Sequence, residues 1–550
     1  MKIFYIFIIY CLILDICTAQ VTQQWVERYN GSANGDDKAT ALAIDASGNV
    51  YVTGYSTGNG TGTDYATIKY NSSGVQQWVA TYNGTGNGDD KATSIAVDAS
   101  GNVYVTGSSR GPGGYYDYGY ATVKYNSYGV QQWVQRYVGT AVHYDRPCAI
   151  AVDGAGNIYV SGYSMDTATY YDYATIKYNS SGVQQWVRRY NGPLNGDDEA
   201  SAIAVDSLGN VYVTGYSDGK NTGYDYATIK YNSSGVQQWV QRYNGLGNDA
   251  DYPTSIAIDG LANVYVTGYS DVGSYHMEYT TIKYNPSGIQ QWVASYNGPG
   301  STSNLANSIA IDVSGNVYVT GTSVLTATTP SYFATVKYNS SGVQQWSATY
   351  NGPGNYENEA TSIAVDGSEN VYVTGYSYGV GTASDYATIK YNSSGVQQWV
   401  QRYNGPVNSY DEACSIAVDS LGNVYVTGFS YGNGTYYDYC TIKYSQENGI
   451  KRISSDVPSE FSLLQNYPNP FNPTTKIQFS IPPSKGVRGM NVKLIIYGVL
   501  GIEVATLVNQ QLKPGTYEVQ WDGSNYPSGV YFYKLESDNF VQSKKLILLK

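Results

Sequence analysis

The sequence predicts an all-β protein, and three observations support that prediction. The chain of 550 residues contains 61 Gly and 61 Tyr but only 17 Pro, and 13% of its residues are charged. Short runs rich in Val, Ile, Tyr and Trp alternate with clusters of Gly, Asn, Asp and Ser, as strands alternate with turns. One block of sequence is also repeated many times. So much apolar and aromatic material excludes a disordered polymer and provides for a large core.

The first element is an N-terminal targeting segment, residues 1–19. Lys2 is followed by an apolar run from Ile3 to Leu14 and then by small residues before Gln20. About 12 apolar residues are too few to cross a bilayer as a helix, so this pattern predicts a cleaved signal peptide. We expect export and a mature protein with no transmembrane segment.

The repeated block begins directly after this segment. Its tryptophans, each preceded by "QQ", are Trp25, Trp78, Trp133, Trp186, Trp239, Trp292, Trp346 and Trp399, spaced by 53 to 55 residues. One block contains four strand-like runs, for example "ATSIAVD", "NVYVTG", "YATVKY" and "VQQWVQRY". Tight turns such as "DASGN" join the first two and the last two runs, whereas the other connections are longer and variable. Tandem four-stranded antiparallel units of this length are typical of propeller blades.

The number of blades follows from the ends of the repeat. The first strands of the blocks end at Asp45, Asp98, Asp153, Asp206, Asp259, Asp312, Asp366 and Asp419. The "QQW" run around Trp25 precedes every other strand, and the last block stops at Tyr444 without a fourth strand. We expect the strand around Trp25 to complete the last blade and cover its open edge. Residues 20–444 are therefore predicted to form an eight-bladed β-propeller.

The blocks resemble a known family. The pattern "AIAVD…GNVYVTG", which returns through residues 20–444, is similar to that of the bacterial SBBP β-propeller repeats. The resemblance implies a propeller and no particular activity. The family name implies seven blades, whereas the count from this chain is eight.

After Tyr444 the composition changes. Residues 445–460 are polar and are expected to be a linker. Residues 461–550 contain strand-like runs such as "NVKLIIY", "YEVQW", "GVYFYKL" and "KKLILLK" between Gly and Pro. So many short strands in about 90 residues predict a small immunoglobulin-like β-sandwich.

This tail resembles the type A C-terminal sorting domain of the type IX secretion system. The matching blocks are "YPNPFNP", "VLGIEVATL", "GTYEVQWDG", "SGVYFYKL" and "KKLILLK". The resemblance implies contact with the type IX machinery, removal of the domain, and display on the outer surface of a Gram-negative bacterium or release. The sorting residues that it implies are Pro468, Asn469, Pro470, Phe471, Gly515, Tyr517, Trp521, Gly529, Tyr531, Lys544, Lys545 and Lys550.

Several classes of chemistry have little support. The two histidines, His143 and His276, fall in different blocks, which disfavours a Ser-His-Asp triad or a His-rich zinc site. After the signal peptide, three scattered cysteines remain (Cys148, Cys414 and Cys440), and they predict no disulfide framework. A net charge of -12 without basic clusters argues against nucleic acid as a partner.

Features repeated in every block are expected to be structural. The aspartates that end the first strands and the lysines near the ends of the third strands should lie at the tight-turn face and stabilise turns and blade contacts. The lysines are Lys69, Lys124, Lys177, Lys230, Lys283, Lys337, Lys390 and Lys443.

The face with the long loops carries the candidate metal site. Carboxylates recur before the first strands and near the starts of the third strands, and clustered oxygen ligands suit Ca²⁺. The alternative is that each carboxylate accepts backbone N–H groups where a strand begins. The sixth block has Asn304 and Tyr332 instead, which suggests that the two positions act together within a blade. The candidate ligands are Asp37, Asp64, Asp90, Asp117, Asp145, Asp172, Asp198, Asp225, Asp251, Asp411 and Asp438.

The same face offers flat aromatic groups that suit a sugar or a protein partner. The alternative is that these rings only pack on the surface. They include Tyr115, Tyr116, Tyr170, Tyr171, Tyr436 and Tyr437. We therefore expect a surface-displayed module that binds or adheres to polysaccharide or to another surface protein, and no enzymatic activity. The alternatives are an extracellular polysaccharide-degrading hydrolase or lyase and a passive structural surface protein.

Overall fold

The computed structural model describes residues 21–140, 144–273, 276–298, 303–324, 330–446, 450–454, 456–483, 489–499, 501, 503–523, 526–537 and 540–550. The expected signal peptide, residues 1–19, and His143 lie outside these ranges. One compact unit spans Gln23–Ser445, and a second contains residues from Gln446 to Lys550. Every regular element within the described ranges is a strand, so the all-β prediction is confirmed. No described helix is long and apolar enough to cross a membrane.

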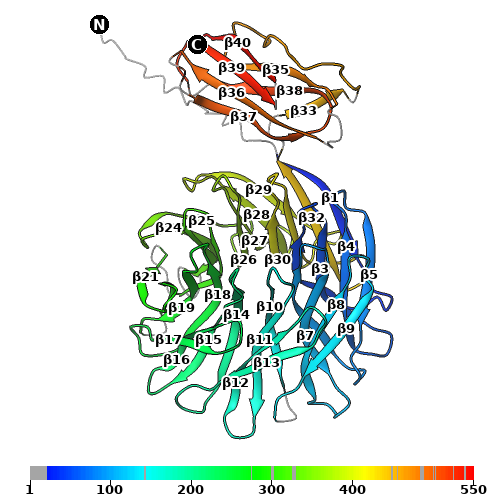
Figure 1. Cartoon of the computed structure of the whole chain (residues 1–550), viewed down its shortest axis with the longest axis vertical. Helices are drawn as coiled ribbons and strands as arrows, with labels where there is room; N and C mark the ends of the chain where they lie inside the picture. The colour runs from blue at the N-terminus through cyan, green and yellow to red at the C-terminus, as the bar shows by residue number, and fades with distance from the viewer. Residues whose placement is uncertain are drawn as a thin grey trace, which may run out of the picture. The chain divides into compact units, whose positions relative to one another are not determined.

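The first compact unit consists of 32 strands in antiparallel groups of four (Figure 1). The first sixteen are β1 (Val21–Tyr29), β2 (Asp37–Ile44), β3 (Val50–Thr57), β4 (Thr63–Tyr70), β5 (Gln76–Tyr82), β6 (Asp90–Val97), β7 (Val103–Arg110), β8 (Tyr118–Tyr125), β9 (Gln131–Tyr137), β10 (Arg146–Val152), β11 (Ile158–Asp166), β12 (Tyr170–Tyr178), β13 (Gln184–Tyr190), β14 (Asp198–Val205), β15 (Val211–Gly219) and β16 (Gly223–Tyr231). The others are β17 (Gln237–Tyr243), β18 (Asp251–Ile258), β19 (Val264–Asp271), β20 (Met277–Tyr284), β21 (Gln290–Tyr296), β22 (Ser303–Ile311), β23 (Val317–Val324), β24 (Ser331–Tyr338), β25 (Gln344–Tyr350), β26 (Asn358–Val365), β27 (Val371–Tyr378), β28 (Ser384–Tyr391), β29 (Gln397–Tyr403), β30 (Asp411–Val418), β31 (Val424–Tyr431) and β32 (Tyr437–Gln446).

Within each group except the one that contains β1, the strands pair in sequence order, as in β14-β15-β16-β17. The first hairpin of that group closes with a tight turn in which Gly209 N donates to Asp206 O over 2.9 Å. Gly209 has a φ of +75°, which glycine adopts without strain. One parallel pair, Met277 with Ser303, additionally joins β20 to β22.

Neighbouring groups share their hydrophobic cores. Tyr212 and Tyr226 of one group pack with Val264, Val266 and Ile282 of the next, and all five are fully buried. Because both faces of the middle strands are covered, β15 is buried almost throughout rather than on alternate residues. This is the packing that the runs of Val, Ile and Tyr predict.

The prediction that the strand around Trp25 completes the last group is confirmed. The order of that sheet is β1-β32-β31-β30, and β1 runs beside β32 (Figure 1). The last group then packs on the first, because Tyr425 and Tyr439 share a buried cluster with Val50 and Val52. The Tyr439 hydroxyl donates to Ala66 O over 3.0 Å, as the equivalent Tyr226 does to Thr280 O over 3.3 Å.

The three described cysteines form no disulfide, as expected. Cys414 shows why one of them occupies a position of Thr or Ser in other blocks. Its thiol contacts Ala39 O of the next group over 3.2 Å, and the Thr40 hydroxyl makes the equivalent contact with Ala92 O over 2.9 Å. Burial raises the pKa of the Cys414 thiol to about 12, so the group is a packed side chain rather than a nucleophile.

The second compact unit contains two four-stranded sheets, β33-β38-β35-β34 and β37-β36-β39-β40. Their strands are β33 (Ile450–Ser454), β34 (Ser462–Leu463), β35 (Thr474–Ile481), β36 (Met490–Gly498), β37 (Glu503–Leu512), β38 (Gly515–Asp522), β39 (Gly529–Ser537) and β40 (Phe540–Leu548). Residues 445–460, expected as a linker, therefore include a strand that pairs with β38.

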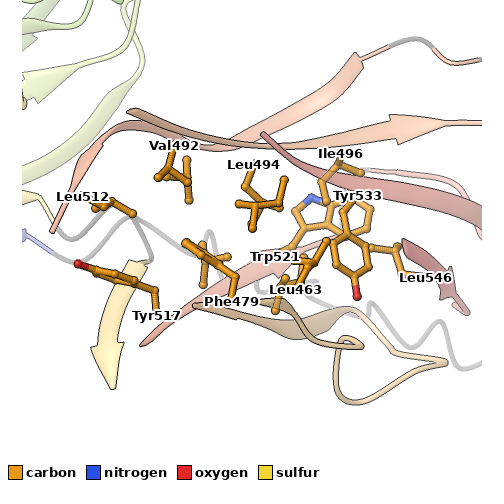
Figure 2. Close-up of a cluster of buried hydrophobic side chains, with 14 of the residues drawn as sticks. Leu463, Phe479, Val492, Leu494, Ile496, Leu512, Tyr517, Trp521, Tyr533 and Leu546 are labelled. Atoms are coloured by element: carbon orange, nitrogen blue, oxygen red, sulfur yellow. The ribbon is translucent and has the colours of Figure 1, made fainter. Parts of the chain in front are cut away.

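The two sheets enclose one hydrophobic cluster. Figure 2 shows Phe479, Tyr517 and Trp521 of one sheet pointing toward Leu494 and Tyr533 of the other. Trp521 is 3% exposed and Leu494 is fully buried. The alternating inward positions of these strands therefore build a core of their own for this unit.

Candidate functional site

The two ends of the four-stranded groups differ in how their connections are built. At the tight-turn end, Asp206 accepts hydrogen bonds from Leu208 N, Asn210 N, Asn210 Nδ2 and the Tyr212 hydroxyl, all between 2.7 and 3.0 Å. Lys230 Nζ lies 5.1 Å from the centroid of the Tyr212 ring and donates to Pro286 O in the next group over 3.0 Å. The prediction that the repeated Asp and Lys stabilise turns and contacts between blades is confirmed.

At the loop end, the carboxylates that begin the first strands accept backbone N–H groups. Asp37 is fully buried, and its Oδ2 accepts from Gly31 N over 2.7 Å while Oδ1 accepts from Thr57 N over 3.2 Å. Each such carboxylate therefore connects the loop before its strand to the strand itself by hydrogen bonds. This is the geometry expected if the carboxylates accept backbone N–H groups rather than bind a metal ion. The bond equivalent to that from Gly31 is made to Asp90, Asp145, Asp198, Asp251, Asp411, Asn304 and Asn358.

The carboxylates near the starts of the third strands bind arginines of the fourth strands. Arg242 Nη2 lies 2.8 Å from Asp225 Oδ2, and the two side chains are 24% and 9% exposed. The other pairs, all at 2.7 or 2.8 Å, are Arg28–Asp438, Arg136–Asp117, Arg189–Asp172 and Arg402–Asp385. Sequence reasoning missed these arginines, although a signal was present. In the five groups with such a pair, Arg stands three residues after the "QQW" tryptophan. In the other three groups, which have Asp64, Glu278 and Tyr332 at the third-strand position, the residue three after the tryptophan is Thr81, Ser295 and Thr349, respectively.

The suggestion that the two acidic positions act together within a blade needs correction. Asp251 of β18 interacts electrostatically with Asp225 of the preceding group, and Asp198 interacts with Asp172 in the same way. The reason is topological, since the loop that enters each first strand runs past the third strand of the group before it. Burial, together with these neighbours, raises the pKa of Asp251 to about 7 and that of Asp198 to about 6.

The Ca²⁺ assignment stays a prediction. Among the described residues, no three His, Cys, Asp or Glu side chains lie close enough together to hold a metal ion. The buried Oδ1 atoms of Asp64, Asp172, Asp225, Asp385 and Asp438 have no hydrogen-bond partner in the described part of the chain.

The tyrosines of the loop end form several small clusters. Tyr170 and Tyr436 are 64% and 59% exposed. Tyr171 packs edge-on against Tyr163, and Tyr437 against Tyr431, with centroid distances of 5.2 and 5.3 Å.

One cluster, which we call the tyrosine–arginine ladder, consists of Arg110, Tyr115, Tyr116, Tyr144 and Arg146. Arg110 lies 5.4 Å from the centroid of the Tyr115 ring, and Arg146 lies 5.4 Å from that of Tyr144. Between them, Tyr115 packs on Tyr116 at 5.1 Å and Tyr116 on Tyr144 at 5.8 Å. Tyr115 and Tyr116 are 66% and 54% exposed. The ladder bridges the group β6–β9 and the group β10–β13.

Charge at the loop end is distributed unevenly around the groups. The residue directly after the first-strand carboxylate is Lys38, Lys91 or Arg146 in three consecutive groups. Lys38 Nζ lies 3.9 Å from the Tyr437 ring centroid, and Lys91 Nζ lies 5.1 Å from that of Tyr55. In the other five groups the same position holds Glu199, Tyr252, Leu305, Glu359 and Glu412.

Two of the acidic residues at this position have a raised pKa. Burial raises the pKa of Glu412, against the opposing effect of Lys38, and the nearby Glu359 raises it further. Burial also raises the pKa of Glu199, against the opposing effect of Tyr216 and Arg146. A half-buried carboxyl group whose pKa is raised keeps its proton to a higher pH than an exposed one, which suits a proton donor.

His276 follows β19 on the connection to β20. Its backbone N–H donates to Gly273 O over 3.2 Å, and its buried Nε2 has no partner in the described part of the chain.

The expected sorting residues fall into two classes. Phe471, Tyr517, Trp521 and Tyr531 are buried in the core of the second unit, where they hold its sheets together. Asn469 Oδ1 accepts from Ile547 N over 3.0 Å, so the "YPNPFNP" segment is fastened to β40. Lys545 and Lys550 are exposed.

Family models match both parts of the chain. The model described as "Beta-propeller repeat" matches residues 24–60, 77–114, 185–221, 238–276, 345–381 and 398–434. The model described as "Secretion system C-terminal sorting domain" matches residues 465–549. The resemblance to SBBP repeats and to a type IX sorting domain is thus confirmed, and the sorting domain marks the chain for secretion. No curated protein matches the chain.

Several solved structures are similar in fold. A fungal alcohol oxidase of the AA5 family in complex with copper has 11% identity and a TM-score of 0.40, over 96% of this chain and 99% of that one. An α-L-arabinanase of Penicillium chrysogenum with arabinobiose and an α-L-arabinofuranosidase of Fusarium graminearum with an iminosugar inhibitor each have 10% identity and a TM-score of 0.35. Both alignments cover 64% of this chain and 91% of the other.

These comparisons correct one expectation. The sequence suggested a protein without enzymatic activity, whereas the similar structures include glycoside hydrolases. The expectation rested on finding no cluster of an acid, a base and an Arg or Lys in one patch. A fold does not fix a function, and the sequence alone does not show which side chains of different blocks lie together.

Proposed function

From the propeller repeats and the C-terminal sorting domain, we propose that this chain is an exported, surface-displayed, eight-bladed propeller whose loop end binds polysaccharide. The closed ring is supported by the pairing of β1 with β32 and by the shared core of the first and last groups. The tail, with its two sheets, would form an immunoglobulin-like sandwich that directs export and is then removed.

The observation that carries the binding proposal is the placement of exposed aromatic rings. At the tight-turn end, repeated tyrosines such as Tyr212 are buried, and Tyr128 of one turn is exposed. At the loop end, Tyr115 and Tyr116 are 66% and 54% exposed and pack against each other. Flat rings that are fixed by neighbouring rings present apolar area at little entropic cost, which suits the faces of sugar rings.

A glycan array tests this proposal. We expect the purified full chain to bind a subset of polysaccharides, and Tyr115→Ala/Tyr116→Ala to lose most of that binding. Lys220→Gln, which changes an exposed side chain on the loop between β15 and β16, serves as the control. A folded wild-type protein that binds no glycan with or without Ca²⁺ or a chelator would exclude the function.

A second candidate function is the degradation of polysaccharide. It is favoured by Glu412, whose raised pKa suits a general acid, and by the electrostatic contact between Glu412 and Glu359, since glycoside hydrolysis uses two carboxyl groups. Release of reducing sugar from a bound glycan, abolished by Glu412→Gln, would establish this candidate. Binding without any product release would exclude it.

A further inference from the structure

The tyrosine–arginine ladder differs from the other aromatic clusters of the loop end in having a guanidinium at each end. Arg110 ends β7 and Arg146 begins β10, so the two cations come from neighbouring groups and face the same set of rings. Neither forms an ion pair with a carboxylate of the described residues. By contrast, Arg28, Arg136, Arg189, Arg242 and Arg402 of the fourth strands are each paired with an aspartate.

The charged neighbours of the ladder form no ion pair with its cations in the described part of the chain, although Arg146 donates a hydrogen bond to the Tyr163 hydroxyl. Asp89 lies close enough to affect the pKa of Tyr118, and its Oδ1 accepts from Thr63 N over 3.1 Å. Glu199 interacts with Arg146 but also bonds to the Tyr216 hydroxyl. Arg110 donates from Nε to Gly114 O over 3.2 Å, which leaves its terminal nitrogens free of described partners.

The loop that carries the exposed rings is held in place. Asp117 is 8% exposed, and its Oδ2 accepts from Gly113 N over 2.7 Å while Oδ1 binds Arg136. Tyr118 stacks on Tyr144 with their planes 6° apart and their centroids 5.4 Å apart. A surface that is already ordered loses little entropy when a ligand binds.

We propose that this ladder binds an anionic polysaccharide, with sugar rings on Tyr115 and Tyr116 and the carboxylate or sulfate groups on Arg110 and Arg146. The inference rests on the proposed function and specifies its ligand class. Guanidinium groups match the geometry of carboxylate and sulfate oxygens and bind them with two parallel hydrogen bonds. In a protein with a net charge of -12, an anionic chain is attracted only where cations gather.

The neighbouring basic residues extend this surface. Lys91, on the first strand of the group β6–β9, and Lys38, on that of the group before it, occupy the position equivalent to Arg146. Each ammonium lies over an aromatic ring, Tyr55 for Lys91 and Tyr437 for Lys38, and forms no ion pair among the described residues. An extended anionic chain thus has further cationic contacts at Lys91 and Lys38. Glu412, which interacts electrostatically with Lys38, limits the surface at that end because it repels an anion.

The experiment measures affinity of the full chain for four probes: polygalacturonate, chondroitin sulfate, neutral linear arabinan and poly-glutamate. We expect polygalacturonate or chondroitin sulfate to bind more tightly than arabinan, with an affinity that falls as salt is added. Arg110→Gln/Arg146→Gln should weaken binding of the anionic glycan about tenfold or more and change arabinan binding by less than about threefold. Lys220→Gln, which removes one exposed positive charge elsewhere on the loop end, should change neither.

The outcomes separate this inference from the proposed function. If neutral and anionic glycans bind equally, or if the double arginine variant retains wild-type affinity, the inference is wrong while polysaccharide binding survives. If no glycan binds, both fail. If poly-glutamate competes for the same residues with equal affinity, the ligand is an acidic protein and the glycan assignment is overturned. The salt dependence of the wild-type protein gives an answer even if the variant does not fold.

Discussion

The two ends of a single strand, β18, carry carboxylates with opposite properties. Asp251 at the loop end is fully buried, and burial raises its pKa to about 7. At the tight-turn end, burial of Asp259 is outweighed by hydrogen bonds from Asn263, Tyr265 and Leu261, which hold its pKa below the usual value. A five-residue turn that begins with Asp and ends with Asn in every block supplies a complete set of donors. A variable loop supplies fewer, so the charge there is a cost to stability.

The same contrast applies to aromatic residues. Tyr265, near the tight-turn end, is fully buried and donates to Asp259 Oδ2 over 3.0 Å. Tyr115 and Tyr116 at the loop end are mostly exposed. The buried Tyr–Asp contact recurs in every group and stabilises the packing of the groups. The exposed tyrosines differ from group to group, so the surface between β6–β9 and β10–β13 differs from the others.

The largest effect should come from breaking the ring itself. Deleting β1, residues 21–29, removes Trp25 and Tyr29 from the shared core of the last and first groups and exposes the edge of β32. We expect a loss on the order of 5 kcal/mol or more in the free energy of unfolding, together with aggregation through the open edge. Thermal unfolding and size-exclusion chromatography measure both, and an unchanged melting temperature would refute closure by β1.

A smaller loss is expected from removing one buried arginine at the loop end. Arg242→Thr leaves the Asp225 carboxylate buried without its partner and should cost about 3 kcal/mol. Adding Asp225→Asn should restore part of that loss, because no unpaired charge remains. Lys230→Gln, near the tight-turn end of β16, the strand that carries Asp225, is the matched control and is expected to cost under about 1 kcal/mol. If Arg242→Thr and Lys230→Gln lower the free energy of unfolding in urea by the same amount, the ion pair adds nothing to stability.

The contrast between Asp251 and Asp259 predicts opposite pH dependences. The folded pKa of Asp251 is above its unfolded value, so its contribution to stability is present below about pH 4 and is lost as the pH rises through about 7. The folded pKa of Asp259 is depressed, so its contribution is present above about pH 4 and is lost as the pH falls.

Asn substitutions isolate each side chain. At pH 8, Asp251→Asn should stabilise the protein by about 1 kcal/mol, and Asp259→Asn should destabilise it by a similar amount. Asn304 and Asn358 already occupy the position of Asp251 in two other groups, so the substitution fits the site. Melting temperatures from pH 4 to pH 8 give the answer, and parallel pH profiles for wild type and Asp251→Asn would contradict it.

The smallest effect on stability is expected at the tyrosine–arginine ladder. Tyr115→Ala/Tyr116→Ala removes mostly exposed rings and should change the free energy of unfolding by less than about 0.5 kcal/mol. The same variant should lose glycan binding, which separates function from stability. A large drop in melting temperature would show instead that the rings are needed to hold the loop.

Much of the fold was predictable because it is written into every block. The spacing of the "QQW" tryptophans predicted the four-stranded groups, and the lone strand around Trp25 predicted its pairing with β32. The site was less predictable. The sequence identified Tyr115 and Tyr116 as candidates. Arg110 and Arg146 belong to different blocks, and only the structure shows that both lie against the same cluster of tyrosines. The Ca²⁺ ligands were chosen by their repetition, and repetition does not distinguish a metal ligand from a residue that accepts backbone hydrogen bonds.

The sequence by itself determined the local structure, since hairpins, turn residues and the alternation of Val, Ile and Tyr depend on residues a few positions apart. It also determined, through the motifs of the tail, that the chain is marked for secretion. Only the tertiary structure decided which carboxylates face each other and which cations stay unpaired. Asp251 interacts electrostatically with Asp225 of the group before it. Arg146 lies over the Tyr144 ring, which packs against Tyr116 in a loop of the group before. Such contacts depend on how neighbouring groups pack, and no pattern within one block contains that information.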